Sequence, residues 1–84
     1  MLAELLANLT TEQRDALEAR GIKSPRQSQF RTGKRLPTEV QVVAIAEVTG
    51  AEWVELQREV TLRRAPPGMR KSIARVIGAT LRNP

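Results

Sequence analysis

The chain has 84 residues, a net charge of +5 and a hydrophobic content of 40%. This length predicts one small domain, and its core must be mostly aliphatic because Phe30 and Trp53 are the only aromatic residues. The lack of Cys excludes disulfides and thiolate sites, and the lack of His removes the usual general base and the commonest metal ligand. We therefore expect no enzymatic activity, no cofactor and no metal.

Charge is distributed along the chain in alternating blocks. Residues 20–35 and 60–84 each carry six cations and no acid, whereas residues 1–19 and 36–59 are net negative. Such a blocked distribution favours a polyanionic partner, such as nucleic acid. A solvated surface with a basic tail remains open as the alternative.

The first two helices are predicted from a leucine pattern and a capping motif. Leucines at i, i+3, i+4 and i+7 predict a short amphipathic helix over residues 2–9. A capping box, with Thr10 as N-cap and Gln13 three residues later, begins the second helix. Gly21 is the expected residue just after its end.

Two further capping boxes predict the third and fourth helices. In the first of them, Ser24 is the expected N-cap, paired with Gln27, and Gly33 ends that helix. The fourth helix runs from the box Thr38-Glu39-Val40-Gln41 to Gly50. Its sequence is apolar nearly all round, so it is the expected central helix of the core.

The C-terminal third predicts a fifth helix and a separate last segment. Trp53, Leu56 and Val60 define one face of the fifth helix, which the Ala65-Pro66-Pro67-Gly68 stretch breaks. After this break, apolar residues recur at helical spacing, alongside basic ones. These apolar residues are Met69, Ile73, Val76, Ile77 and Leu81. Helix is favoured there, although three β-branched residues leave a strand arm open.

The run from Gly21 to Pro37 resembles the second half of the helix-turn-helix in the Cro/CI-type, lambda-repressor-like family. In that family a Gly and an aliphatic residue form the turn, and the recognition helix ends in Ser-x-aromatic-Arg-x-Gly before basic residues and a Pro. Residues 38–50 also look like the family's fourth helix, so the resemblance covers roughly residues 10–62. It implies an all-α bundle of about five short helices over residues 1–65. Residues 66–84 would add a C-terminal helix or arm, for dimerisation or as a basic tail.

Two residues depart from the family's packing pattern. Gln27 stands where an aliphatic core residue is usual, and Leu17 stands where a small Ala is usual. These departures predict that the helix before Gly21 is placed or packed differently, or shortened.

The resemblance assigns roles residue by residue. Gly21, Ile22 and Phe30 would form the turn and the core of the motif. Base contacts would come from Arg26, Ser28, Gln29 and Thr32, since Gln pairs bidentately with adenine. Phosphate contacts would come from Lys23, Ser24, Arg31, Lys34 and Arg35. A dimer interface would use Trp53, Leu56, Met69, Ile73, Val76 and Ile77.

The implied function is sequence-specific binding of double-stranded DNA by a small transcriptional regulator of the phage kind. It would act as a homodimer on paired operator half-sites, in the cytoplasm of a bacterium or a phage-infected cell. No membrane and no small-molecule substrate are expected. The alternative is a protein-interaction module, such as an antirepressor or adaptor, on a degenerate helix-turn-helix scaffold.

Overall fold

The computed structural model describes the backbone of residues 1–82 and the side chains of residues 1–77. Over the described backbone the chain is all-α, which confirms the predicted class, and the segment after the Pro-Pro-Gly break is helical rather than a strand. Leu81, the last residue of the predicted apolar pattern, lies outside the described side chains. The elements are α1 (Leu2–Ala7), α2 (Thr11–Ala19), α3 (Ser24–Thr32), α4 (Glu39–Thr49), α5 (Trp53–Arg64), the 3₁₀ turn η1 (Pro67–Met69) and α6 (Arg70–Arg82).

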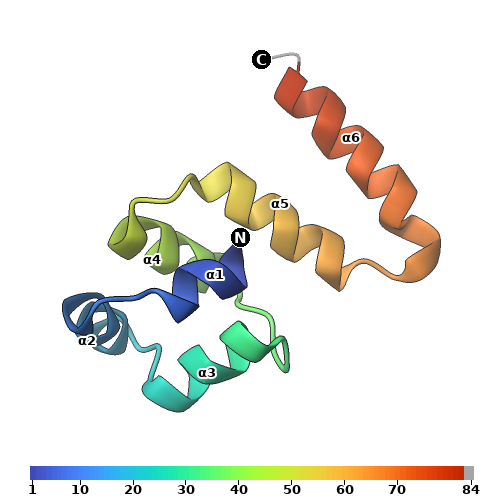
Figure 1. Cartoon of the computed structure of the whole chain (residues 1–84). Helices are drawn as coiled ribbons and strands as arrows, with labels where there is room; N and C mark the ends of the chain where they lie inside the picture. Colours follow the sequence, from blue (N-terminus) through green and yellow to red (C-terminus); the bar gives the residue numbers. More distant parts are fainter. Residues whose placement is uncertain (83–84) are drawn as a thin grey trace.

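The first five helices form one body, from which α6 projects (Figure 1). Within the body, α1 packs against α3, α2 against α4, and α4 against α5. Among the described residues, α6 packs mainly against its chain neighbours α5 and η1. None of the described helices combines the length and the apolarity that crossing a membrane requires.

Side-chain caps fix where α2 and α4 begin, as predicted. The N–H of Gln13 donates to Thr10 Oγ1 at 3.1 Å, and the N–H of Thr10 donates to Gln13 Oε1 at 2.9 Å. Thr38 and Gln41 exchange the same two bonds at 3.2 and 2.8 Å at the start of α4. Each box satisfies two backbone donors that the helix itself leaves unpaired.

Gly21 ends α2 in the predicted place because the chain there needs a positive φ. Its φ is +88°, and the following N–H of Ile22 donates to the carbonyl of Leu17 at 2.9 Å. The N–H of Gly21 donates to Glu18 at 3.0 Å, which completes a Schellman motif. A side chain at this position would be strained, so the motif selects glycine.

The capping box predicted at Ser24 is wrong. The N-cap of α3 is Lys23, with no side-chain cap, and Ser24 is already the first helical residue. Pro25 is therefore the second helical residue, not the first. The amide of Gln27 is turned into the protein and bonds elsewhere, so it cannot return to cap the helix.

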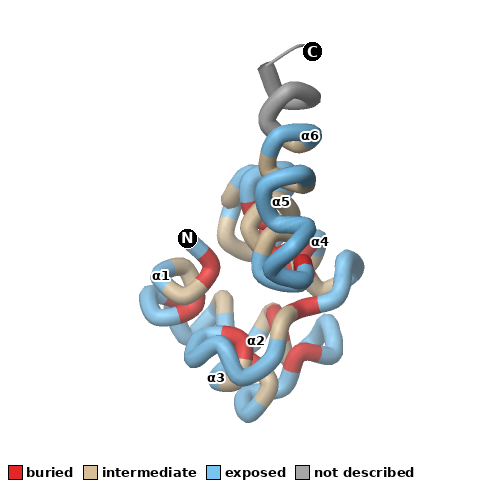
Figure 2. The backbone as a smooth tube through the Cα atoms, turned by 90° about the vertical axis from the view of Figure 1, so that its right-hand side faces the viewer, coloured by how far each residue is buried: buried red, intermediate tan, exposed pale blue. Residues whose placement is uncertain are grey.

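The core lies between the five helices of the body, and Figure 2 shows its buried positions along the backbone. Its largest fully buried side chains are Leu2, Leu17, Ile22, Phe30, Val42, Ile45, Leu56 and Val60. Leu17 thus fills a core position in α2. Leu9 is also buried, but it lies beyond the end of α1 rather than inside the predicted helix.

Two expectations about α4 and α5 need correction. Val40 is 79% exposed and Val43 also faces solvent, so α4 has an outer face despite its apolar sequence. Trp53 is 44% exposed and does not share the burial of Leu56 and Val60. Because α2 and α5 pack on α4 without enclosing it, the apolar sequence of α4 does not imply burial all round.

Glu59 of α5 fixes the start of α1, the helix on which α3 packs. Its carboxylate accepts bonds from the Met1 ammonium and from the N–H of Leu2, both at 3.0 Å. Burial alone would raise the pKa of Glu59. The hydrogen bonds from Met1 and Leu2, with the charges of Met1 and Arg63, outweigh burial and hold the pKa below its ordinary value.

Candidate nucleic-acid interface

The third helix lies at the edge of the body, with one side on the core and the other in solvent (Figure 1). Phe30 and Gln27 point inward, and Gly33 ends the helix with a φ of +80°. The exposed residues of α3 are Ser24, Pro25, Ser28, Arg31 and Thr32, while Arg26 and Gln29 are half-buried at its flank. Of the four predicted base contacts, Ser28 and Thr32 are therefore exposed, and Arg26 and Gln29 are only partly so.

Gln27 fastens α3 to the preceding turn and to α2. Its side chain is only 7% exposed, and its Nε2 donates to the carbonyls of Ile22 at 2.9 Å and Arg14 at 3.2 Å. A buried amide is stable only when it is hydrogen-bonded, and these carbonyls supply the partners. The signal for this contact in the sequence was a Gln where the resemblance implied an aliphatic residue, but the local pattern predicted a helix cap for that Gln.

We expect Gln27→Leu to lower the free energy of unfolding by about 1–3 kcal/mol, because it keeps the volume but leaves a buried carbonyl unpaired. Urea unfolding followed by circular dichroism measures the change. Ser28→Ala, an exposed neighbour, is the control and is expected to stay within about 0.5 kcal/mol of the parent. Equal stability of Gln27→Leu and the parent would contradict this role.

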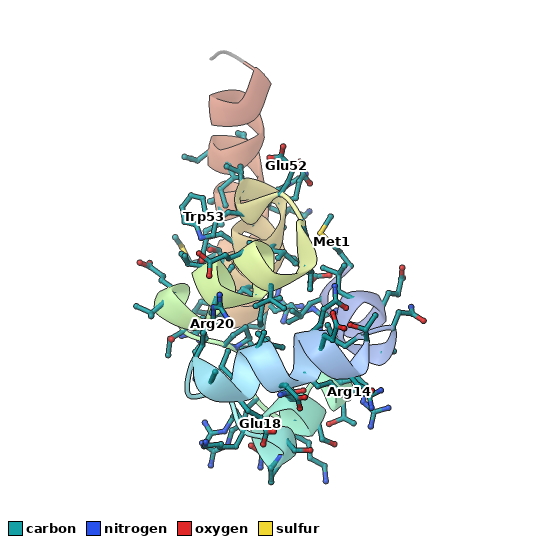
Figure 3. The ribbon with its side chains drawn as sticks, turned by 90° about the vertical axis from the view of Figure 1, so that its left-hand side faces the viewer. Met1, Arg14, Glu18, Arg20, Glu52 and Trp53 are labelled. Atoms are coloured by element: carbon teal, nitrogen blue, oxygen red, sulfur yellow. The ribbon has the colours of Figure 1, made fainter. Side chains whose placement is uncertain are left out.

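One flank of α3 carries a recess of about 290 Å³ between α3, α2 and α1. Ser24, Ser28 and Arg31 of α3 line it together with Arg14 of α2. In Figure 3 the Arg14 side chain points from α2 toward the side of the molecule where α3 lies. Arg14 was not among the predicted contacts, because it stands in an acidic stretch of the sequence and only the fold brings it to this flank.

The other flank of α3 opens toward the start of α4. Lys23, Arg26 and Gln29 line a recess of about 340 Å³ there, with Gln41 of α4. Beside it lies a second hollow of about 610 Å³. Arg26 lines this hollow too, together with Lys34 and Arg35. Arg26 thus lies between the predicted base contact Gln29 and the predicted phosphate contacts.

Arg64 fixes the loop that carries Lys34 and Arg35. Its Nη2 donates to the carbonyl of Leu36 at 3.2 Å and to that of Pro37 as well. A guanidinium held by two carbonyls restrains the chain between α3 and α4. Arg64 itself lines the basic hollow, where its guanidinium is held in place by these carbonyls.

Most cations around α3 have no acidic partner. Among the described residues, no ion pair forms at the six cations Arg14, Lys23, Arg26, Arg31, Lys34 and Arg35. Arg20 differs, because it pairs with Glu47 of α4 at 2.6 Å and belongs to the α2–α4 contact. The basic block of the sequence therefore becomes an uncompensated surface on both flanks of one exposed helix.

The predicted dimer-interface residues do not form one exposed surface. Leu56 is fully buried inside the single chain, so its assignment to an interface is wrong. Trp53, Met69 and Val76 are exposed, and Ile73 and Ile77 are half-buried. Ile22 and Phe30, in contrast, are buried as the core of the α2–α3 pair requires.

No protein-family model, curated protein or solved structure matches this chain. A function is therefore inferred from its own residues. The relevant features are the exposed helix α3, its polar outer face and the cations on both of its flanks, which form no ion pair among the described residues.

Proposed function

We propose that this chain binds double-stranded DNA sequence-specifically, as a small transcriptional regulator of the Cro/repressor-like kind. The α2–α3 pair would act as a helix-turn-helix, with α3 in the major groove and two copies on paired half-sites. The observation that carries the proposal is the set of unpaired cations on both flanks of α3. Mechanistically, occupancy of the operator would block or recruit polymerase.

The dimensions and chemistry of α3 suit a DNA groove. An α-helix with its side chains is about 10–12 Å wide, and the major groove is about 12 Å wide. The outer face of α3 carries the small polar side chains Ser28 and Thr32, with Gln29 half-buried at its edge, and all three could approach base edges. Arg14 and Arg31 line a recess on one flank, and Lys34 and Arg35 line one on the other, so the proposal assigns one pair to each phosphate backbone.

Base contacts and phosphate contacts predict different mutant phenotypes. We expect Gln29→Ala to change sequence preference, costing about 1–3 kcal/mol on the preferred duplex and little on random DNA. Lys34→Ala is expected to weaken binding to all sequences about equally and to lower the salt slope by about one. Fluorescence anisotropy with labelled duplexes, titrated at several salt concentrations, measures both.

Equal losses on preferred and random DNA for both variants would remove the base-reading role of Gln29. The competing function, a protein-interaction module, predicts a different result for the parent protein. In that case no duplex would be bound at moderate salt, and an acidic protein would be the partner of the basic face.

A further inference from the structure

The recess of about 290 Å³ between α1, α2 and α3 combines cationic, polar and apolar side chains. Its polar lining consists of Arg14 of α2 and of Ser24, Gln27, Ser28 and Arg31 of α3. Leu6 and Ala7 of α1 supply its apolar part, and none of the residues described around it is acidic. Three helices therefore build one small site with a positive charge and an apolar wall.

The two arginines of the recess have no partner that neutralises them. Among the described residues, neither guanidinium forms an ion pair, and no hydrogen bond engages the hydroxyls of Ser24 and Ser28. A guanidinium presents its N–H donors in a planar fork, which matches the oxygens of a phosphate group. Two such forks with two hydroxyls beside them suit an oxyanion.

Gln27 ties the two arginine-bearing helices together at this recess. Its side chain is only 7% exposed, and its Nε2 donates to the backbone carbonyl of Arg14 at 3.2 Å. The backbone that carries Arg14 is therefore held against α3, the helix that carries Arg31. A site whose walls are already fixed binds its ligand with a smaller loss of conformational entropy.

The start of α3 adds to the positive potential of the recess. Lys23, the N-cap, provides no side-chain hydrogen bond to the first turn, and Ser24, the first helical residue, lines the recess. The positive end of the helix dipole thus lies close to the two guanidinium groups. The dipole and the arginines favour the same kind of ligand, an anion.

We propose that this recess binds the phosphate group of a phosphate monoester, such as a nucleoside monophosphate, and that this ligand competes with duplex DNA. A monoester carries about −1.5 to −2 charges at pH 7, which matches two guanidinium groups. A backbone phosphodiester carries only about −1. Leu6 and Ala7 would contact carbon atoms of the ligand. Because Arg14 and Arg31 are also the cations assigned to one DNA strand, a bound monoester would exclude that strand.

This inference deepens the proposed function by giving the same flank a competing ligand, and only the competition rests on that function. Ligand binding is tested on the full chain without DNA. The probes are adenosine 5′-monophosphate (AMP), cyclic AMP, which is a phosphodiester, and adenosine, all at one ionic strength. NMR titration of the backbone amides gives the affinity of each probe and the place where it binds.

AMP should bind at least roughly tenfold more tightly than cyclic AMP, and adenosine should not bind measurably. Arg14→Gln and Arg31→Gln should each weaken AMP binding at least roughly tenfold, because each removes charge-assisted hydrogen bonds to the phosphate. Arg35→Gln, on the other flank of α3, is the matched control and should change the affinity by less than about twofold. Circular dichroism verifies that the three variants are folded.

The absence of amide shifts up to about 10 mM AMP would overturn the inference. Folded arginine variants that bind AMP as well as the parent would overturn it too. Cyclic AMP bound as tightly as AMP would assign the recess to phosphodiesters, such as the DNA backbone, and not to a monoester.

Competition is measured with a labelled duplex at constant ionic strength, where AMP should displace the duplex from the parent protein. A duplex that stays bound while AMP fills the recess would refute the competition. A parent that binds a duplex but no AMP would refute the inference alone. A parent that binds AMP in the recess but no duplex would refute the proposed function alone.

Discussion

Duplex binding should fall roughly a hundredfold at about 0.15 M salt when Arg31, Lys34 and Arg35 are all replaced by Gln. The three cations flank α3, and none of them is paired with an acid among the described residues. Each phosphate contact contributes about 0.9 to the slope of log affinity against log salt, so the slope should fall by about 2.7. The loss should be similar on every sequence, because phosphates carry no sequence information.

Anisotropy titrations between low and moderate salt measure this slope, with circular dichroism to verify the fold. Arg75→Gln is the matched single-charge control, since Arg75 is an exposed cation of α6, away from the candidate interface. Its slope should stay close to that of the parent. A triple variant whose slope is unchanged would show that these residues do not meet phosphates.

The second large effect concerns Phe30, which holds α3 in place. Phe30 is 1% exposed and belongs to the core cluster against which α1 and α3 pack. Phe30→Ala should cost about 3–5 kcal/mol, because it removes buried area and leaves a cavity. A domain of this size has only a few kcal/mol of stability, so the variant should be largely unfolded at 25 °C.

The helical circular dichroism signal and a urea titration measure this loss. Phe30→Leu is the control, because it keeps an apolar side chain in the site and should cost much less than the alanine variant. Duplex binding should follow folding, so it is lost in Phe30→Ala and largely kept in Phe30→Leu. A folded Phe30→Ala protein with nearly the parent's midpoint would contradict the role given to this ring.

Local signals in the sequence predicted the helices of the body well. The boxes at Thr10 and Thr38 were confirmed because each cap depends on residues only three positions apart. The positive φ of Gly21 likewise depends on its own turn. The box at Ser24 had the same sequence form but was wrong, because a tertiary contact of Gln27 outweighs the local cap.

Features that depend on packing between distant segments were not predictable. Arg14 reaches the flank of α3 only because α2 and α3 are joined by a tight turn, and nothing in the sequence around Arg14 indicates it. The exposure of Val40 follows from which sides of α4 the helices α2 and α5 cover, and Leu56 is buried where α5 packs on the body. Hydrophobicity alone identifies candidates for the core, but the partner helix decides which of them are buried.

Selection of binding sites from a pool of random duplexes tests the DNA-binding proposal most directly. The parent protein is expected to enrich one motif as an inverted repeat, with half-site centres about one helical turn, ~10 base pairs, apart. Selection with Gln29→Ala should shift the preferred base at one position in each half-site. A pool that stays random after repeated rounds with the folded parent protein would contradict sequence-specific DNA binding.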